Sequence, residues 1–335
     1  MNLKHKKYLK VGLIFGLIAY GIFLLIEVSL FFINEEKSMS GAVFYGLMIY
    51  IWVIVLFLEY TFGAKPQKRH VDAGNIEQEI LDRKKIRMLK RAKELKGQRL
   101  SFSRQNQLKK ILPLYRKLPD SLKPKLEERI LLFQEMVKFE SHPKRSTEIT
   151  QQTRDMVSAE ACLLIIHRSP TDYLLLEYIE LWSSKPKDWE GEVLGEVLGD
   201  ANYRIVRLDL KFLERNVNDG EDGFNIVLHE FAHVLDFADD KIANSIPVSK
   251  DSSDYLRWKT LLDREYPKLQ AAHRRRLNPL LREYAVSSPT RAEFFTCATE
   301  SFFERPVMLK KENPEIYYLL GYYYVLDPAE WIEGQ

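Results

Sequence analysis

The segment His229-Glu230-Phe231-Ala232-His233 brings two imidazoles and a carboxylate close together in the chain. On a helix, residues four apart lie one above the other on one face, so both imidazoles can bind one metal ion. The carboxylate of Glu230 lies beside the first imidazole, where it can reach a water held by that metal. This pattern predicts a zinc site with Glu230 as general base. The alternative is a pair of core histidines satisfied by hydrogen bonds.

The neighbouring residues predict that this segment is a buried helix. Apolar residues fill most of positions 224–235, and Asp222-Gly223 before them is a turn-like start. A helix that is apolar nearly all round belongs in a core. A histidine buried there needs a polar or metal partner, which favours the metal site over two unrelated histidines.

A catalytic zinc site takes three protein ligands and leaves one position for water. Glu293 and Glu300 are seven residues apart in an apolar segment, so they share one face of the expected helix. Burying carboxylates among phenylalanines is unfavourable without a cation or a donor. We expect Glu293 to be the third ligand and Glu300 to orient a histidine, and the reverse assignment stays open. The five histidines outside the motif carry no supporting pattern: His5, His70, His142, His167 and His273.

Two segments, FNIVLHEFAHVLD (224–236) and REYAVSSPTRAEFFTCATESFFERP (282–306), resemble the Mlc titration factor A family of zinc-dependent peptidases. The similarity extends from about residue 113 to residue 328. The resemblance implies that Glu293 completes the metal site and that Tyr284 stabilises the transition state. It also implies a peptide or protein substrate. The family's partner is a glucose-responsive transcriptional repressor, so a transcriptional regulator is a candidate partner, although the family's soluble members lack anything like residues 1–112.

The expected mechanism is metal-assisted hydrolysis of peptide bonds with one zinc ion per chain. Zinc held by His229, His233 and Glu293 lowers the pKa of its bound water toward about 7. Glu230 accepts the proton and delivers it to the leaving amine, while zinc, assisted by Tyr284, stabilises the oxyanion. The competing interpretation is a zinc-containing membrane scaffold that sequesters a regulatory protein with little or no hydrolysis.

Residues 113–335 are expected to form an α+β zincin-like metallopeptidase domain, mostly helical with a small sheet. Apolar spacing predicts helices over residues 119–140 and 157–166. Residues 173–182 and 203–210 are typical of strands. We expect residues 203–210, just before the metal helix, to be an open sheet edge to which a peptide adds as a further strand; ordinary sheet core is the alternative.

Residues 1–64 predict a transmembrane hairpin with spans at about 11–33 and 41–62. Each span is long enough to cross a bilayer as a helix, and each contains one acidic residue, Glu27 or Glu59, and no Lys or Arg. Basic residues precede the first span and follow the second, whereas the connecting loop is acidic. The positive-inside rule therefore places the amino terminus and the peptidase domain in the cytoplasm, on the cytoplasmic (inner) membrane.

Residues 65–112 are expected to form a basic helical connector. They contain 15 Lys/Arg against 5 Asp/Glu, although the whole chain is nearly balanced with 50 against 47. Their position beside a span favours contact with an anionic lipid surface, where each basic residue contributes about 1 kcal/mol. A solvated helix is the simpler alternative. Binding of nucleic acid is disfavoured because no aromatic interleaving or DNA-reading motif is present.

Overall fold

The structure is a computed structural model, and it describes residues 73–142, 147–183, 195–198, 204–238, 243–287 and 291–333. The expected transmembrane spans, 11–33 and 41–62, lie outside these residues. Among the helices that are described, none is both long and apolar enough to cross a bilayer. The chain divides into two compact units, Met1–Gln78 and Glu79–Gln335, and the elements discussed below lie in the second, apart from the start of the helix Ala73–Glu94.

Four strands form one sheet in the order β1-β2-β4-β3. β1 (Lys138–Ser141), β2 (Tyr178–Trp182) and β4 (Ile205–Asp209) are parallel, and β3 (Gly195–Leu198) is antiparallel to β4. β4 therefore lies inside the sheet with hydrogen-bonded neighbours on both sides. The expectation that this segment is an open edge is wrong, because β3 covers that side and itself forms the edge.

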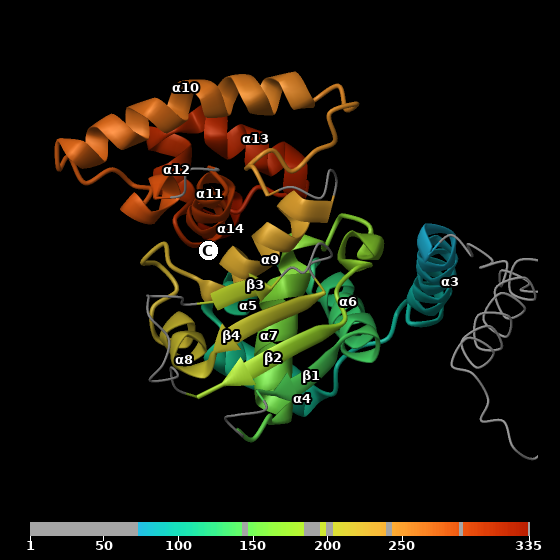
Figure 1. The fold of residues 1–335 in the computed structure, drawn as a ribbon. Coiled ribbons are helices and arrows are strands. Elements are labelled where there is room, and N and C mark those ends of the chain that lie inside the picture. Colours follow the sequence, from blue (N-terminus) through green and yellow to red (C-terminus); the bar gives the residue numbers. More distant parts are fainter. Residues whose placement is uncertain are drawn as a thin grey trace, which may run out of the picture. The chain divides into compact units, whose positions relative to one another are not determined.

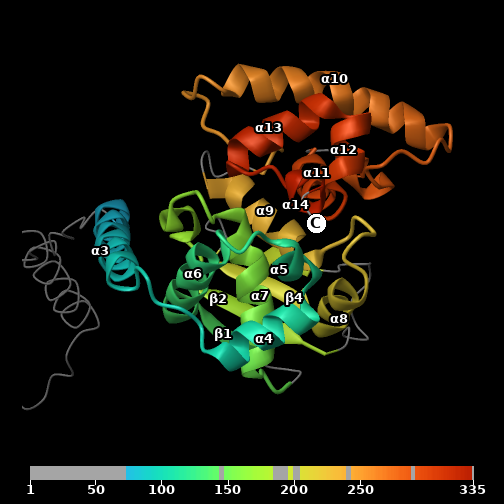
Figure 2. The ribbon, with the colours of Figure 1, turned by 180° about the vertical axis from the view of Figure 1, so that it is seen from behind.

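Helices cover one face of this sheet, as Figures 1 and 2 show from opposite sides. They are α4 (Phe102–Ile111), α5 (Pro113–Lys117), α6 (Lys123–Met136) and α7 (Gln151–Leu164). α6 and α7 match the two expected helices, but residues 138–140, predicted as the end of the first helix, belong to strand β1. The first of the two expected strands, residues 173–182, starts later than predicted, because the 3-10 helix η1 (Pro170–Tyr173) precedes β2.

The expected connector contains two helices, α3 (Ala73–Glu94) and α4. Met88 and Leu95 pack with Leu132 of α6, whereas Leu100 and Leu108 belong to the main hydrophobic core. The compact unit therefore includes the second half of the segment expected as a connector. The division of the chain into hairpin, connector and peptidase domain stays a prediction.

The described residues that follow β4 in the chain form helices and the loops between them. α8 (Leu210–Asn218) follows β4, and α9 (Ile226–Ala238) carries the two histidines of the motif. α9 contacts α7 on the sheet side and α11 (Glu293–Glu304) on the other. The 3-10 helix η2 (Glu283–Val286) precedes α11. The remaining helices gather around α11, as Figure 1 shows: α10 (Tyr255–Arg274), α12 (Pro306–Glu312), α13 (Pro314–Tyr324) and α14 (Glu330–Glu333).

Candidate metal centre

α9 begins at Ile226 because Asn225 caps it. The side-chain oxygen of Asn225 accepts the backbone N–H groups two and three residues further on, at 3.1 and 3.0 Å. Gly223 precedes the cap with φ of 74°, a conformation that favours glycine, and a Cβ there would lie 3.1 Å from Arg305 Nε. The turn-like Asp222-Gly223 pair thus sets the entry into the helix.

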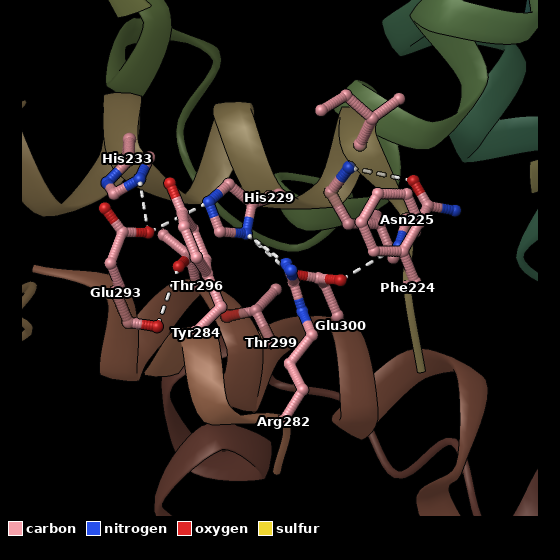
Figure 3. Close-up of polar contacts among 12 residues, drawn as sticks. Phe224, Asn225, His229, His233, Arg282, Tyr284, Glu293, Thr296, Thr299 and Glu300 are labelled. Atoms are coloured by element: carbon pink, nitrogen blue, oxygen red, sulfur yellow. Dashed lines mark hydrogen bonds and ion pairs between the residues drawn. The ribbon is translucent and has the colours of Figure 1, made fainter. Parts of the chain in front are cut away.

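The imidazoles of His229 and His233 meet the carboxylate of Glu293 between α9 and α11, as Figure 3 shows. Oε2 of Glu293 lies 3.1 Å from Nε2 of His229 and 3.3 Å from Nε2 of His233. Among the described residues, this buried oxygen has no hydrogen-bond partner of acceptable geometry. A carboxylate oxygen buried between two imidazole nitrogens without a hydrogen bond fits a set of ligands for one cation.

The charges of these groups depend on one another. Burial would raise the pKa of Glu293, but His229 and His233 lower it well below its usual range. For Glu230, only 4% exposed, burial raises the pKa of the carboxyl, and the two histidines oppose that rise. A raised pKa gives Glu230 more of the basicity that proton transfer near neutral pH requires.

Glu300 lies on the other side of His229. Its Oε1 is 2.5 Å from Nδ1 of His229 and accepts a hydrogen bond from Nη2 of Arg282 at 2.6 Å. Its Oε2 accepts the backbone N–H of Asn225 at 2.9 Å. A proton on Nδ1 facing this carboxylate leaves Nε2 free to bind a metal. The arrangement favours Glu293 as ligand and Glu300 as the partner of His229.

A second group of ligand atoms overlaps the first. A ring nitrogen of His229, Sγ of Cys297 and a carboxylate oxygen of Glu300 lie within 4.8 Å of one another, and all three residues are buried. Burial raises the pKa of the Cys297 thiol, which keeps it protonated. The oxygens of Glu300 already accept hydrogen bonds from Arg282 and Asn225. This enclosed group fits a catalytic metal less well than His229, His233 and Glu293, because catalysis needs an open position.

Tyr284 lies on η2, and its ring extends toward the imidazoles in Figure 3. Its ring centroid is 5.7 Å from that of His229, and the residue is 42% exposed. The guanidinium of Arg282 lies 5.0 Å from the Tyr284 ring. Burial and the charge of Glu293 raise the pKa of Tyr284, so its hydroxyl keeps the proton that a hydrogen-bond donor needs.

Two further carboxylates are buried beside Asn225. Its Nδ2 donates to Oε1 of Glu160 at 2.8 Å and to Oε1 of Glu304 at 3.2 Å. Burial raises the pKa of Glu160 to about 7 and that of Glu304 to about 9. Glu160 and Glu304 could have been found by the same sequence signal as Glu300, namely a carboxylate within an apolar segment. Nothing in the local sequence marks Arg282, because its contact with Glu300 joins residues 18 positions apart. Asn225 does carry a local signal, since Asn before an apolar segment is a typical N-cap residue.

The mostly helical fold and the His-His-Glu group fit a protein of the metallopeptidase type. The chain belongs to the glucose-regulated metallo-peptidase family M90, whose sequence model matches residues 86–325. The resemblance to Mlc titration factor A is thereby confirmed, and the match begins inside the expected connector.

Relatives agree with this assignment. The uncharacterized protein slr2042 of Synechocystis sp. is 28% identical over 228 residues, which cover 65% of this chain and 81% of that protein. Mlc titration factor A of Edwardsiella ictaluri is 30% identical over 110 residues, covering 32% of this chain and 41% of the relative. That of Pectobacterium atrosepticum is 30% identical over 112 residues, covering 32% and 40%. The chain therefore matches about two fifths of each titration factor.

Replacing Glu300 with Gln is expected to weaken metal binding about 10- to 100-fold. The amide cannot accept hydrogen bonds from His229, Arg282 and the Asn225 backbone at once, so the imidazole loses its fixed orientation. Competition with a chromogenic chelator measures the dissociation constant. Glu140→Gln, on the exposed surface of β1, is the matched control. Equal affinity of the Glu300 variant and wild type would show that Glu300 does not orient the ligand.

The raised pKa of Glu160 predicts that stability falls as pH rises. The folded chain keeps this proton up to about pH 7, whereas the unfolded chain releases it near 4.5. Over that range the free energy of unfolding decreases by up to about 1.4 kcal/mol per pH unit. Glu160→Gln cannot titrate, so its urea-unfolding profile against pH is expected to be flatter than that of wild type. Parallel profiles would contradict the assignment.

Proposed function

We propose that this protein is a membrane-anchored cytoplasmic zinc metallopeptidase. One observation carries the metallopeptidase part of the proposal: a buried carboxylate oxygen of Glu293 faces Nε2 of His229 and of His233 at 3.1 and 3.3 Å. Its support is the membership of the chain in a metallopeptidase family. Two imidazoles with one carboxylate are a ligand set typical of catalytic zinc.

The residues around the metal have separate roles in peptide hydrolysis. A zinc ion, when bound, supplies a Lewis acid and lowers the pKa of water toward about 7. Glu230 accepts the proton of the attacking water and passes it to the leaving amine. Tyr284 donates a hydrogen bond to the oxygen that becomes negative in the transition state. Glu300 holds the ring of His229 in place, and Arg282 neutralises the charge of Glu300.

The substrate is a peptide or protein that binds along β3. This strand forms an edge of the sheet and contacts α9, which carries the proposed metal ligands. An extended chain adds to such an edge through backbone hydrogen bonds. The main chain of the substrate then runs past α9, so its scissile bond reaches the carboxylate of Glu230.

The anchor consists of the apolar segments 11–33 and 41–62, with both the amino terminus and the catalytic domain in the cytoplasm. α3 follows the anchor and supports contact with an anionic lipid surface. Ile86 and Leu89 on this helix are 68% and 38% exposed, and exposed basic residues flank them. An exposed apolar and basic helix surface binds anionic membranes through both burial and charge.

A regulatory protein is a further candidate partner. The name of two relatives, Mlc titration factor A, describes titration of Mlc. If this chain acts as those relatives are named, it binds a transcriptional regulator. A scaffold with little hydrolysis is therefore the second candidate function. The carboxylate of Glu230 discriminates between the two, because a scaffold does not use it.

Glu230→Gln is expected to lower the rate of peptide cleavage by a factor of about 10² to 10⁴ while zinc content stays at one ion per chain. The amide keeps the size of the side chain but cannot accept the proton. Cleavage of a peptide library and metal analysis measure the two quantities on the same sample. Glu214→Gln, an exposed change on α8, is the control. Undiminished cleavage by Glu230→Gln would exclude the mechanism, and a cellular effect that survives without cleavage would favour the scaffold.

The proposed anchor predicts that the whole chain sediments with membranes and stays there in high salt. Apolar burial, unlike charge attraction, is not screened by ions. High salt also screens the attraction of α3 to anionic lipid, so deletion of residues 1–64 is expected to release the protein into the supernatant in high salt, as immunoblotting of the fractions would show. Release of the whole chain by salt alone would contradict two membrane spans.

A further inference from the structure

α11, which carries Glu293 in its first turn, has no side-chain cap of its own. Its N-cap residue is Ala292, whose methyl group cannot accept a hydrogen bond. The first N–H groups of a helix need partners from outside the helix. The hydroxyl of Ser245 supplies one, because its Oγ accepts the N–H of Phe295 at 2.8 Å. An N-cap side chain ordinarily fills this role, and here a residue distant in sequence fills it.

The same hydroxyl also holds the backbone on the other side of Glu293. Oγ of Ser245 donates to the carbonyl oxygen of Arg291 at 2.6 Å. One hydroxyl group therefore bridges the residue two positions before Glu293 and the residue two positions after it. Arg291 has φ of 63°, in the left-handed region, which an ordinary side chain adopts only when its surroundings hold it there.

Ser245 is in turn held by α9. The carboxylate oxygen Oδ2 of Asp236 accepts the N–H of Ser245 at 2.7 Å, and both residues are at most 1% exposed. Asp236 lies three residues after His233, almost one turn further along the same helix. Ser245 itself has φ of 64°, so its backbone is also in the left-handed region. A continuous chain of hydrogen bonds thus joins the helix of both histidines to the first turn of the helix of Glu293.

We infer that Asp236 and Ser245 are positioning residues that set where the Glu293 carboxylate lies relative to the two imidazoles. The inference rests on the proposed metal site, because it explains how the Glu293 carboxylate is held near Nε2 of His229 and of His233. Neither residue contacts the metal position. Each acts on backbone atoms, Asp236 on Ser245 and Ser245 on the residues that flank Glu293.

The test separates the hydroxyl of Ser245 from the strain of its backbone. Ser245→Gly removes the hydroxyl, but glycine adopts φ of 64° freely, so the fold is retained. Ser245→Thr keeps the hydroxyl, but a β-branched residue is strained in this region, so the fold loses stability. Ser101→Gly is the control, because Ser101 caps α4 by accepting the N–H of Arg104 at 3.5 Å, far from the site in sequence.

Cobalt(II) and zinc binding to the purified whole chain provide the readouts, beside thermal unfolding. Ser245→Gly is expected to bind zinc about ten-fold more weakly than wild type and to show an altered visible cobalt spectrum, with near-normal unfolding. Ser245→Thr is expected to unfold at a lower temperature yet to retain wild-type affinity and spectrum. Ser101→Gly is expected to bind both metals like wild type.

Three outcomes are separable. If wild type binds neither metal, the proposed metal site itself fails. If wild type binds both and Ser245→Gly binds them with the same affinity and spectrum, the positioning role is wrong although the site stands. Equal loss of affinity in Ser245→Gly and Ser245→Thr would also overturn the role, because the hydroxyl would then not be the group that matters.

Discussion

Burial of opposite charges between α9 and α11 is the constraint on which this structure depends. Glu230, Glu293 and Glu300 all lie on these two helices with the imidazoles of His229 and His233. Carboxylates in such surroundings are unfavourable unless a cation or a donor compensates each of them. Arg282 and the Nδ1 side of His229 satisfy Glu300. Among the described residues, Glu293 Oε2 has no hydrogen-bond partner, and this lack of compensation supports the proposed metal ion.

The two helices are joined to each other at both ends, so the side chains of His229, His233 and Glu293 between them are held in place. At the start of α9, the N–H of Asn225 binds Glu300 and its side-chain amide binds Glu304, both on α11. At the other end, Asp236 is joined through Ser245 to the first turn of α11. A metal site needs such support because small displacements of a ligand weaken binding and activity strongly.

The sequence could predict those parts of the site that depend on the spacing of residues close together in the chain. Two histidines four residues apart imply one face of a helix, and Glu293 and Glu300 within an apolar segment imply buried carboxylates. The structure brings His229, His233 and Glu293 together, and their role as ligands stays a prediction. Arg282 carries no such signal, because its role depends on its side-chain contacts with Glu300 and Tyr284, which the fold brings about. The same holds for Ser245, whose partner helix begins far along the chain.

For the fold, too, the features that depend on local sequence were predicted, and those that depend on distant residues were not. Long apolar periodic segments predicted α6, α7 and α9, whereas the position of β4 in the sheet was predicted wrongly. Sheet order is a non-local property, and here it depends on β3, a strand of 4 residues with too few positions to show alternation. The boundary of the folded unit is also non-local, since Leu100 and Leu108 join a core made mostly of residues after 113.

X-ray absorption spectroscopy of the zinc-loaded protein tests the ligand set directly, because the two overlapping groups of candidate ligands differ in one atom type. Binding by His229, His233 and Glu293 predicts nitrogen and oxygen neighbours alone, at about 2.0 to 2.2 Å, with the outer-shell scattering of two imidazoles. A sulfur neighbour at about 2.3 Å together with a single imidazole would place the metal at His229, Cys297 and Glu300 and contradict the account.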